Sequence, residues 1–168
     1  MSQLMIAPPP VGMLVDGPQW VLAAPFRAHV VHLMETAQVP WPVVAYQAGV
    51  PLATLHTLLF GRHGKLRTKI THYAATQLIE LRTEDLAWMR NSQVSAENTG
   101  TRIRLLRSHL ITWAQIADAL VLSEETCQAI ARGERTSCSV MVEVLAQSAC
   151  AAIGLDPWDE VGDDDEAF

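Results

Sequence analysis

The sequence contains no apolar run close to the roughly 20 residues that a membrane-spanning helix needs. Residues 1–24 hold no lysine or arginine, and prolines interrupt their apolar stretch, so they lack the basic start and unbroken apolar segment of a secretory signal. Cysteine is scarce as well, because three thiols in 168 residues are too few for a disulfide-stapled fold. We therefore expect a cytoplasmic protein with no membrane partner.

Charge is sparse and unevenly distributed. Charged residues make up 18% of the chain and hydrophobic residues 49%, a balance that supplies a buried core and excludes disorder throughout. The formal net charge is −6, yet residues 156–168 hold seven acids and no base. Residues 25–82 hold six bases and two acids, and residues 99–155 hold five of each. The first half can therefore attract a polyanion despite the acidic total.

Apolar residues recur at helical spacing in both halves, and no segment alternates with period two, so we expect helices and little or no sheet. In the first half, helices are expected from Phe26, over 42–48, over 51–60, and from an N-cap at Thr68 to Leu81. In the second half, they are expected from Thr99 or Thr101, after Trp113, from an N-cap at Ser123 to Arg132, and over 139–153.

The two halves align on each other with a shift of 72 residues and no gap over the central stretch. Trp41 then falls on Trp113 and Gly61 on Gly133, with apolar residues matched between them. This self-similarity predicts an internal duplication. We expect an all-α protein of two tandem helix-turn-helix units, each a three- to four-helix bundle. The predicted boundaries are an N-terminal arm over 1–24, units over 25–82 and 99–155, a partly helical linker over 83–98, and an acidic tail over 156–168.

The stretch from Val44 to His56 has the pattern of a helix-turn-helix. Ala45 is small where two helices cross, and Gly49 allows a tight turn with a positive φ. A second helix presented in this way fits the major groove of DNA. The residues expected to face the bases are Leu52, Ala53, Thr54, His56 and Thr57.

A basic segment follows this helix. Arg62, Lys65, Arg67 and Lys69 lie within eight residues, with His63 between them. Such a cluster is suited to phosphate contacts, which supply much of the affinity for DNA, and a helix beginning at Thr68 would add backbone amides. The alternative is that the segment is only a solvated turn.

The second unit has Val121 where the first has Gly49, so we expect its turn to be strained or differently shaped. Gln128 can pair with adenine, but Glu124 and Glu125 would repel phosphates. We therefore expect the first unit to be the better reader. The remaining candidate DNA contacts, on or beside the helices of the second unit, are Arg102, Arg104, Arg132 and Arg135.

Three segments carry a family resemblance: Gly61–Leu81, Thr99–Leu106 and Trp113–Ala117. Together they resemble the tandem helix-turn-helix proteins of actinobacteria and their phages, over about residues 26–155. The resemblance implies DNA binding through both units and the role of a transcription regulator, such as a phage repressor, associated with the nucleoid. The sequence departs from the family's arginine-rich pattern at Phe60, Glu124 and Glu125.

Other chemistries have little support. The spacing of Cys127, Cys138 and Cys150 matches no zinc site, and Cys127 aligns with Leu55, which predicts a core position. No phosphate-cradling glycine loop, zinc-protease motif or nucleophile elbow is present, so we expect neither an enzyme nor a cofactor.

The competing hypothesis is an interaction or dimerisation module with degenerate helix-turn-helix units. Its partner, a second copy or another protein, would bind around Phe60, Leu52 and the Trp-bearing linker. The acidic tail is either a solubilising end or a tethered polyanion that competes with DNA for the basic segment.

Overall fold

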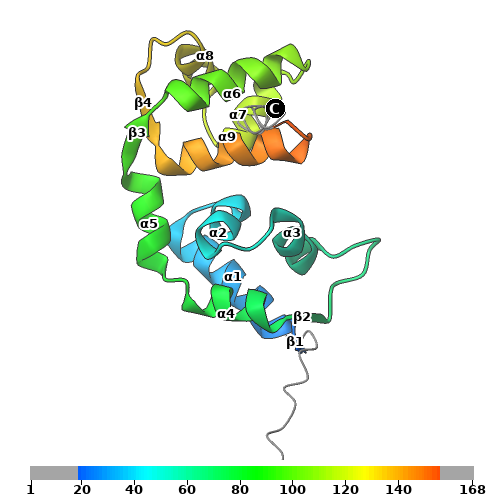
Figure 1. Ribbon diagram of the computed structural model, residues 1–168. Helices are drawn as coiled ribbons and strands as arrows, with labels where there is room; N and C mark the ends of the chain where they lie inside the picture. Colours follow the sequence, from blue (N-terminus) through cyan, green and yellow to red (C-terminus); the bar gives the residue numbers. More distant parts are fainter. Residues whose placement is uncertain (1–18, 156–168) are drawn as a thin grey trace, which may run out of the picture.

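The computed structural model describes residues 19–155, in which nine helices and four three-residue strands form two lobes joined by one helix (Figure 1). The first lobe comprises β1 (Trp20–Leu22), α1 (Ala24–Ala37), α2 (Trp41–Ala48), α3 (Leu52–Phe60), β2 (Lys69–Thr71) and α4 (His72–Glu80). The joining helix is α5 (Thr83–Asn91). The second lobe comprises β3 (Gln93–Ser95), α6 (Glu97–Ser108), α7 (Trp113–Leu120), α8 (Glu124–Ala131), β4 (Ser137–Ser139) and α9 (Val140–Ala152).

The two lobes repeat one order of elements: strand, three helices, strand, helix. α2 begins at Trp41 and α7 at Trp113, 72 residues later, and both helices are eight residues long. The later elements are offset by less because the segment after α3 is longer than the segment after α8. The sequence offset thus corresponds to a recurrence of helices in the same order.

Residues 19–155 are mostly helical, as predicted, but they also form two small antiparallel sheets that the sequence did not indicate. β1 pairs with β2, with Val21 opposite Ile70, and β3 pairs with β4, with Val94 opposite Cys138. Each sheet ties the start of a lobe to the strand that precedes its last helix. Strands of three residues are too short to display an alternating pattern, which is why they were missed.

Two predicted helix starts are wrong. Lys69–Thr71 forms β2, with Ile70 buried against the core, so Thr68 caps no helix. The cap is Thr71, whose Oγ1 accepts from the amide of Ala74 at 3.2 Å. α6 begins at Glu97 rather than at either predicted threonine, and Thr99 is buried. Ser123, by contrast, caps α8 as predicted, accepting from the amide of Thr126 at 3.1 Å.

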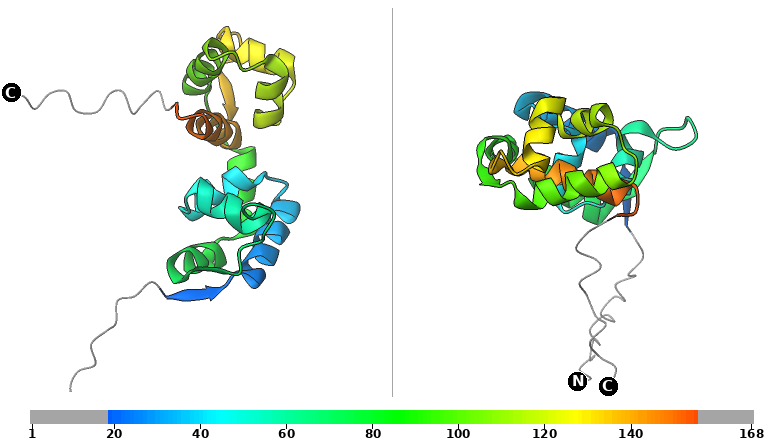
Figure 2. Two further views of the ribbon diagram at one scale, coloured as in Figure 1. Left: turned by 90° about the vertical axis from the view of Figure 1, so that its right-hand side faces the viewer. Right: turned by 90° about the horizontal axis from the view of Figure 1, so that it is seen from above.

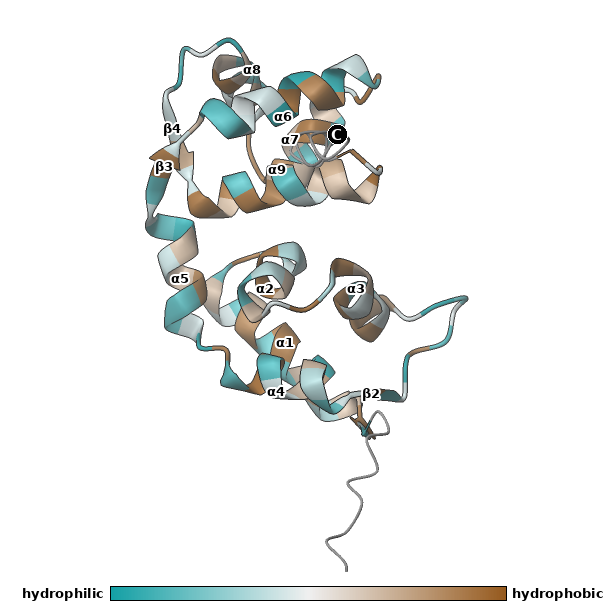
Figure 3. Ribbon diagram, in the orientation of Figure 1, coloured by the Kyte–Doolittle hydropathy of each residue, from teal (hydrophilic) through white to brown (hydrophobic). Residues whose placement is uncertain are grey.

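α9 connects the lobes. It packs on α6 and α7 in its own lobe, and on α2 and α5 across the boundary. Hydrophobic residues predominate in α9 and in α3 (Figure 3). α5 is anchored by the buried Leu86 and Met89, while Trp88 remains 60% exposed. None of the helices described in residues 19–155 combines the length and apolarity needed to cross a bilayer.

Candidate nucleic-acid interface

The helix pair α2–α3 has the turn that its sequence indicates. Gly49 ends α2 with φ +66°, and the amide of Val50 donates to the backbone oxygen of Ala45 at 3.0 Å. Ala45 is buried where the helices meet, and Leu55 and Leu58 fix α3 to the core. The remaining faces of α3 are therefore the ones available for contacts outside the lobe.

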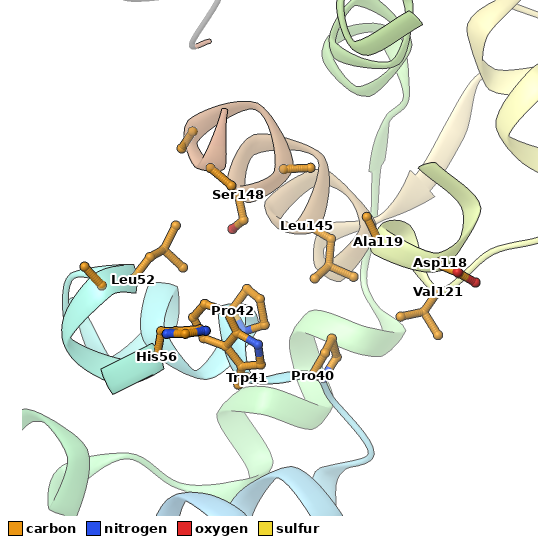
Figure 4. Close-up of a pocket in the computed structure, with 14 residues that line it drawn as sticks. Pro40, Trp41, Pro42, Leu52, His56, Asp118, Ala119, Val121, Leu145 and Ser148 are labelled. Carbon is orange, nitrogen blue, oxygen red and sulfur yellow. The ribbon is translucent and has the colours of Figure 1, made fainter. Parts of the chain in front are cut away.

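One of those faces is directed at the second lobe. Leu52, Ala53 and His56 line a groove of about 610 Å³, and Leu145 and Ser148 of α9 lie across from them (Figure 4). Because α9 lies across this groove, that face of α3 is not free to enter the major groove of a DNA duplex in this arrangement. Of the other predicted base contacts on α3, Thr54 is half-buried and Thr57 donates its hydroxyl to the backbone oxygen of Ala53 at 2.7 Å.

His56 also belongs to an aromatic cluster. Its ring centroid lies 5.5 Å from that of Trp41 and 5.0 Å from that of Phe60, and the Trp41 and Phe60 centroids are 6.2 Å apart. Edge-to-face contacts of this kind stabilise aromatic clusters. The exposed imidazole thus lies beside two apolar rings.

The basic segment after α3 is a tight hairpin that projects from the lobe (Figure 1). Arg62 and Lys65 exchange backbone hydrogen bonds of 2.9 and 3.1 Å, and His63 and Gly64 form the turn with φ of +52° and +76°. Two consecutive positive φ values define a type I′ turn. We call residues 61–69 the basic hairpin.

The cations of the basic hairpin differ in their freedom. Within residues 19–155, the exposed side chains of Arg62, Lys65 and Lys69 make no hydrogen bond or ion pair. Arg67 is half-buried, with its guanidinium 5.7 Å from the ring centroid of Trp20. The predicted helix N-terminus at Thr68 and Lys69 is absent, because these residues lead into β2.

Arg27 on α1 holds the base of the hairpin, a role that sequence analysis missed. Its Nε donates to the backbone oxygen of Leu58 and its Nη2 to that of Arg67, both at 2.7 Å. These two carbonyls lie before and after the hairpin turn, so one guanidinium joins α3 to the returning chain. A single arginine on a helix otherwise carries no signal for such a contact.

The equivalent helix pair in the second lobe is α7–α8. Thr112 and Gln115 form a capping box at the start of α7, and Val121 makes the turn with φ +55° and ψ +44°. Gly49 has φ +66° and ψ +29°, so the two turns share one left-handed conformation. Of the two outcomes expected for this turn, it is the strained one that occurs, since a β-branched residue is disfavoured there.

α8 is open to solvent on the side of its lobe that faces away from the first lobe (Figures 1 and 2). Cys127 and Ile130 bury its inner face, as the alignment with Leu55 predicted for Cys127. Its outer face presents Gln128 and Arg132 together with Glu124 and Glu125. The acids lie in the first turn, where the helix dipole favours them.

Gln128 lies in a hollow lined by three arginines and Trp113, with a volume of about 460 Å³. Arg104 donates from Nη1 to the backbone oxygen of Ala131 at 2.8 Å. Arg107 donates from Nη1 to that of Ile111 at 2.7 Å, and its guanidinium lies 4.9 Å from the Trp113 ring centroid. We call the residues that line this hollow, Arg104, Arg107, Trp113, Gln128, Ala131 and Arg132, the arginine hollow.

Two other arginines that the sequence predicts to contact DNA, Arg102 and Arg135, do not line the arginine hollow. Arg102 is only 5% exposed, so the expectation that it contacts DNA is wrong: it faces the interior of the second lobe. Arg135 is exposed and lines a separate hollow of about 280 Å³ with Gly100 and Arg104. Arg132 pairs with Glu134 through Nε at 2.8 Å and Nη2 at 3.1 Å, and this pairing raises its pKa further.

Three corresponding positions therefore lie in different surroundings in the two lobes, and two of them differ in residue type. At the offset of 72 residues, Trp41, His56 and Phe60 correspond to Trp113, Gln128 and Arg132. The first set forms an aromatic cluster against an apolar groove, and the second belongs to an arginine-lined hollow open to solvent.

The chain as a whole matches no known family model, no curated protein and no solved structure.

The cysteines are part of the core. Cys127, Cys138 and Cys150 are buried and form no disulfide. Burial raises the pKa of the Cys127 and Cys138 thiols, with nearby carboxylates adding to the effect. No group of three or more potential metal-ligating side chains occurs in the part of the chain that is described.

Proposed function

We propose that the two lobes are tandem helix-turn-helix units and that the second unit binds double-stranded DNA through α8. The observation that supports this most is the placement of Gln128 on an open helix, within a hollow lined by Arg104, Arg107 and Arg132. A glutamine can bond both edge atoms of adenine in the major groove, and arginines bind phosphates or guanine. The groove-facing α3 offers no comparable polar surface.

The basic hairpin supplies a second, sequence-independent attraction. Its exposed cations, Arg62, Lys65 and Lys69, lack internal partners in residues 19–155, so phosphates can approach them without breaking an ion pair. Contacts of this kind raise the affinity for any duplex and weaken with salt. In this proposal the chain is a DNA-binding regulator whose base reading resides in one unit.

The test begins with the selection of bound duplexes from a random pool, followed by fluorescence anisotropy with the winning sequence. Gln128→Ala should lower the affinity for the selected site by about 5- to 150-fold, the equivalent of about 1–3 kcal/mol, and barely affect binding to random DNA. His56→Ala, at the corresponding position of the first unit, is the matched control and should bind as the parent does. If His56→Ala loses affinity for the selected site and Gln128→Ala binds it as the parent does, base reading would be assigned to α3.

Arg132→Ala tests the arginine hollow. It should weaken binding to all duplexes and lower the slope of log affinity against log salt by about one charge between about 50 and 200 mM salt. Arg82→Ala removes an exposed cation at the start of α5 and serves as its control. Absence of binding to any duplex at the lower salt concentration would exclude the function itself.

A second candidate function is a protein-interaction module, and one observation favours it. Phe60 is 56% exposed and Trp88 60% exposed, although both are large and apolar. Light scattering across a range of protein concentrations tests it: a mass that doubles in the parent, and not in Phe60→Ser, would indicate dimerisation through the first unit.

A further inference from the structure

The groove between the lobes has walls from both halves of the chain. One wall is formed by the first turn of α2 and the start of α3, where Trp41, Pro42 and Leu52 lie. The other is formed by the end of α7 and by α9, which contribute Ala119, Leu145 and Ala149 (Figure 4). At about 610 Å³ the groove lies within the range of roughly 300–1,000 Å³ that is common for small-molecule sites.

The walls are almost uncharged. Pro40, Trp41 and Pro42 supply ring faces, and the opposite wall is rich in alanine and also includes Val121 and Leu145. Asp118 is the single ionisable acid among the lining residues, and neither lysine nor arginine lines the groove. An anion would therefore enter without a lysine or arginine to pair with and close to Asp118, which disfavours phosphates and carboxylates.

Two polar groups could orient an apolar ligand. The His56 ring has no hydrogen-bond partner in residues 19–155, so one of its nitrogens is available to donate or accept. Ser148 already donates its hydroxyl to the backbone oxygen of Val144 at 2.9 Å, so its Oγ can accept. Ligand sites at domain boundaries commonly combine a mostly apolar lining with a few polar groups.

The dimensions favour a small molecule over a peptide. An α-helix about 10 Å in diameter would fill this volume within about one and a half turns, too short a length for helix recognition. α2 packs against α9 beside the groove. A flat ring system needs less depth than a helix and can lie between the proline–tryptophan wall and the alanine wall.

We propose that this groove binds a neutral, flat aromatic molecule of two or three rings that carries an N–H or O–H group at one edge. The rings lie against Trp41 and its flanking prolines, and the polar edge meets His56 and Ser148. This site is independent of the proposed DNA contacts on α8, so either can fail without the other.

The full chain is tested with two dyes of one skeleton. N-phenyl-1-naphthylamine is neutral and has an N–H group, whereas 8-anilino-1-naphthalenesulfonate adds a negative charge. The neutral dye should bind with one-to-one stoichiometry and gain fluorescence, and the sulfonate should bind at least tenfold more weakly. Equal affinities for the two dyes would overturn the proposal, since the groove would then show no charge selection.

Variants locate the dye. Ala53→Trp and Ala152→Trp fill the groove from opposite walls and should each abolish binding of the neutral dye, while Ala28→Trp, at an exposed position of α1 away from the groove, should leave it unchanged. His56→Ala should weaken binding severalfold without changing the stoichiometry. Undiminished binding by both filled variants would place the dye elsewhere and contradict the proposal.

The same assay tests two other possible occupants of the groove, residues 156–168 and a second copy of the chain. A chain ending at Leu155 that binds the dye, when the full chain does not, would show that residues 156–168 occupy the groove. Loss of dye binding with rising protein concentration, in step with a doubled mass, would show that a second copy does so. Either result would overturn the small-molecule assignment.

Discussion

At the scale of single residues, the most informative contrast is between Gly49 and Val121. They occupy corresponding turns with nearly the same left-handed backbone. Glycine adopts this conformation without steric penalty, whereas an L-residue with a branched Cβ is disfavoured there. The second turn is therefore maintained by its surroundings: the buried Leu120 before it, and the amide of Leu122, which donates to the backbone oxygen of Ala117 at 3.0 Å.

Val121→Gly should raise the free energy of unfolding by about 1 kcal/mol, because relief of the left-handed strain outweighs the greater entropy of glycine in the unfolded chain. Little packing is lost, since Val121 is 60% exposed. Urea denaturation gives the free energy, and Gly49→Val should show the opposite change. A destabilised Val121→Gly variant would mean that contacts of the valine outweigh its backbone strain.

The buried thiols predict how stability depends on pH. An unfolded cysteine loses its proton near about pH 8.5, but burial raises the pKa of Cys127 and Cys138 in the folded chain. Between these pKa values the folded state binds more protons than the unfolded state, so the free energy of unfolding falls as pH rises. This contribution is fully present below the unfolded pKa and is lost as pH rises through the folded pKa.

Denaturation between neutral pH and about pH 9.5 measures this loss. Cys127→Ala/Cys138→Ala starts from a lower stability, because it removes buried atoms, yet it should lose less stability over the same interval. Lysines and tyrosines also titrate near this range, and they are common to both proteins. Equal pH slopes in the parent and the double variant would contradict the role of the thiols.

At the scale of elements, the sequence predicted the helices that form the repeat and missed the features that join them. The starts of α2, α3, α7 and α8 follow from prolines, glycines and capping residues that act within a turn of the chain. The sheet pairing of Val21 with Ile70 and the bonds from Arg27 to Leu58 and Arg67 bring together residues that lie far apart in sequence. Local sequence patterns do not predict contacts between residues so far apart in the chain.

For the candidate site too, the sequence predicted local features and missed those that depend on distant residues. Spacing identified the outer face of α3 and the cations after it, but not that Leu52, Ala53 and His56 face a groove walled by α9. It also could not indicate that Arg102 is buried while Arg104 and Arg107 surround Gln128. Which face of a helix remains open depends on the docking of distant elements, and the residue pattern of the helix itself does not contain that information.

The basic hairpin yields a prediction at this scale. Arg62→Ala/Lys65→Ala removes two exposed cations and should weaken binding to random and selected duplexes alike, lowering the salt slope by about two charges. Anisotropy titrations at several salt concentrations measure the slope.

Gly61→Ala tests whether the hairpin geometry itself matters. Gly61 has φ +76°, and an added Cβ would lie 2.3 Å from the backbone oxygen of Lys65, so the hairpin must open. This variant keeps every charge and should weaken binding less than the loss of the two cations does. If removing both cations leaves the slope unchanged, the hairpin does not contact phosphates.

At the scale of the whole molecule, the two lobes do not present their second helices to one common surface. α3 faces the inter-lobe groove, and α8 lies on the opposite side of the second lobe (Figure 1). The packing of α9 on both α2 and α5 maintains this arrangement. A protein that reads two half-sites places its recognition helices about 34 Å apart along one face of the duplex, which this placement of α3 and α8 does not provide.

This arrangement predicts that a monomer bound to its selected site protects a single half-site. Hydroxyl-radical footprinting should show one protected tract, with the bound mass measured in parallel so that a dimer is not mistaken for two-lobe binding. Gln128→Ala should erase the tract, and His56→Ala should retain it, because Gln128 lies in the hollow proposed to contact DNA and His56 faces the inter-lobe groove. Two tracts one helical turn apart under a monomer would require α3 to leave α9, and base reading would then be shared by both lobes, as the family resemblance implies.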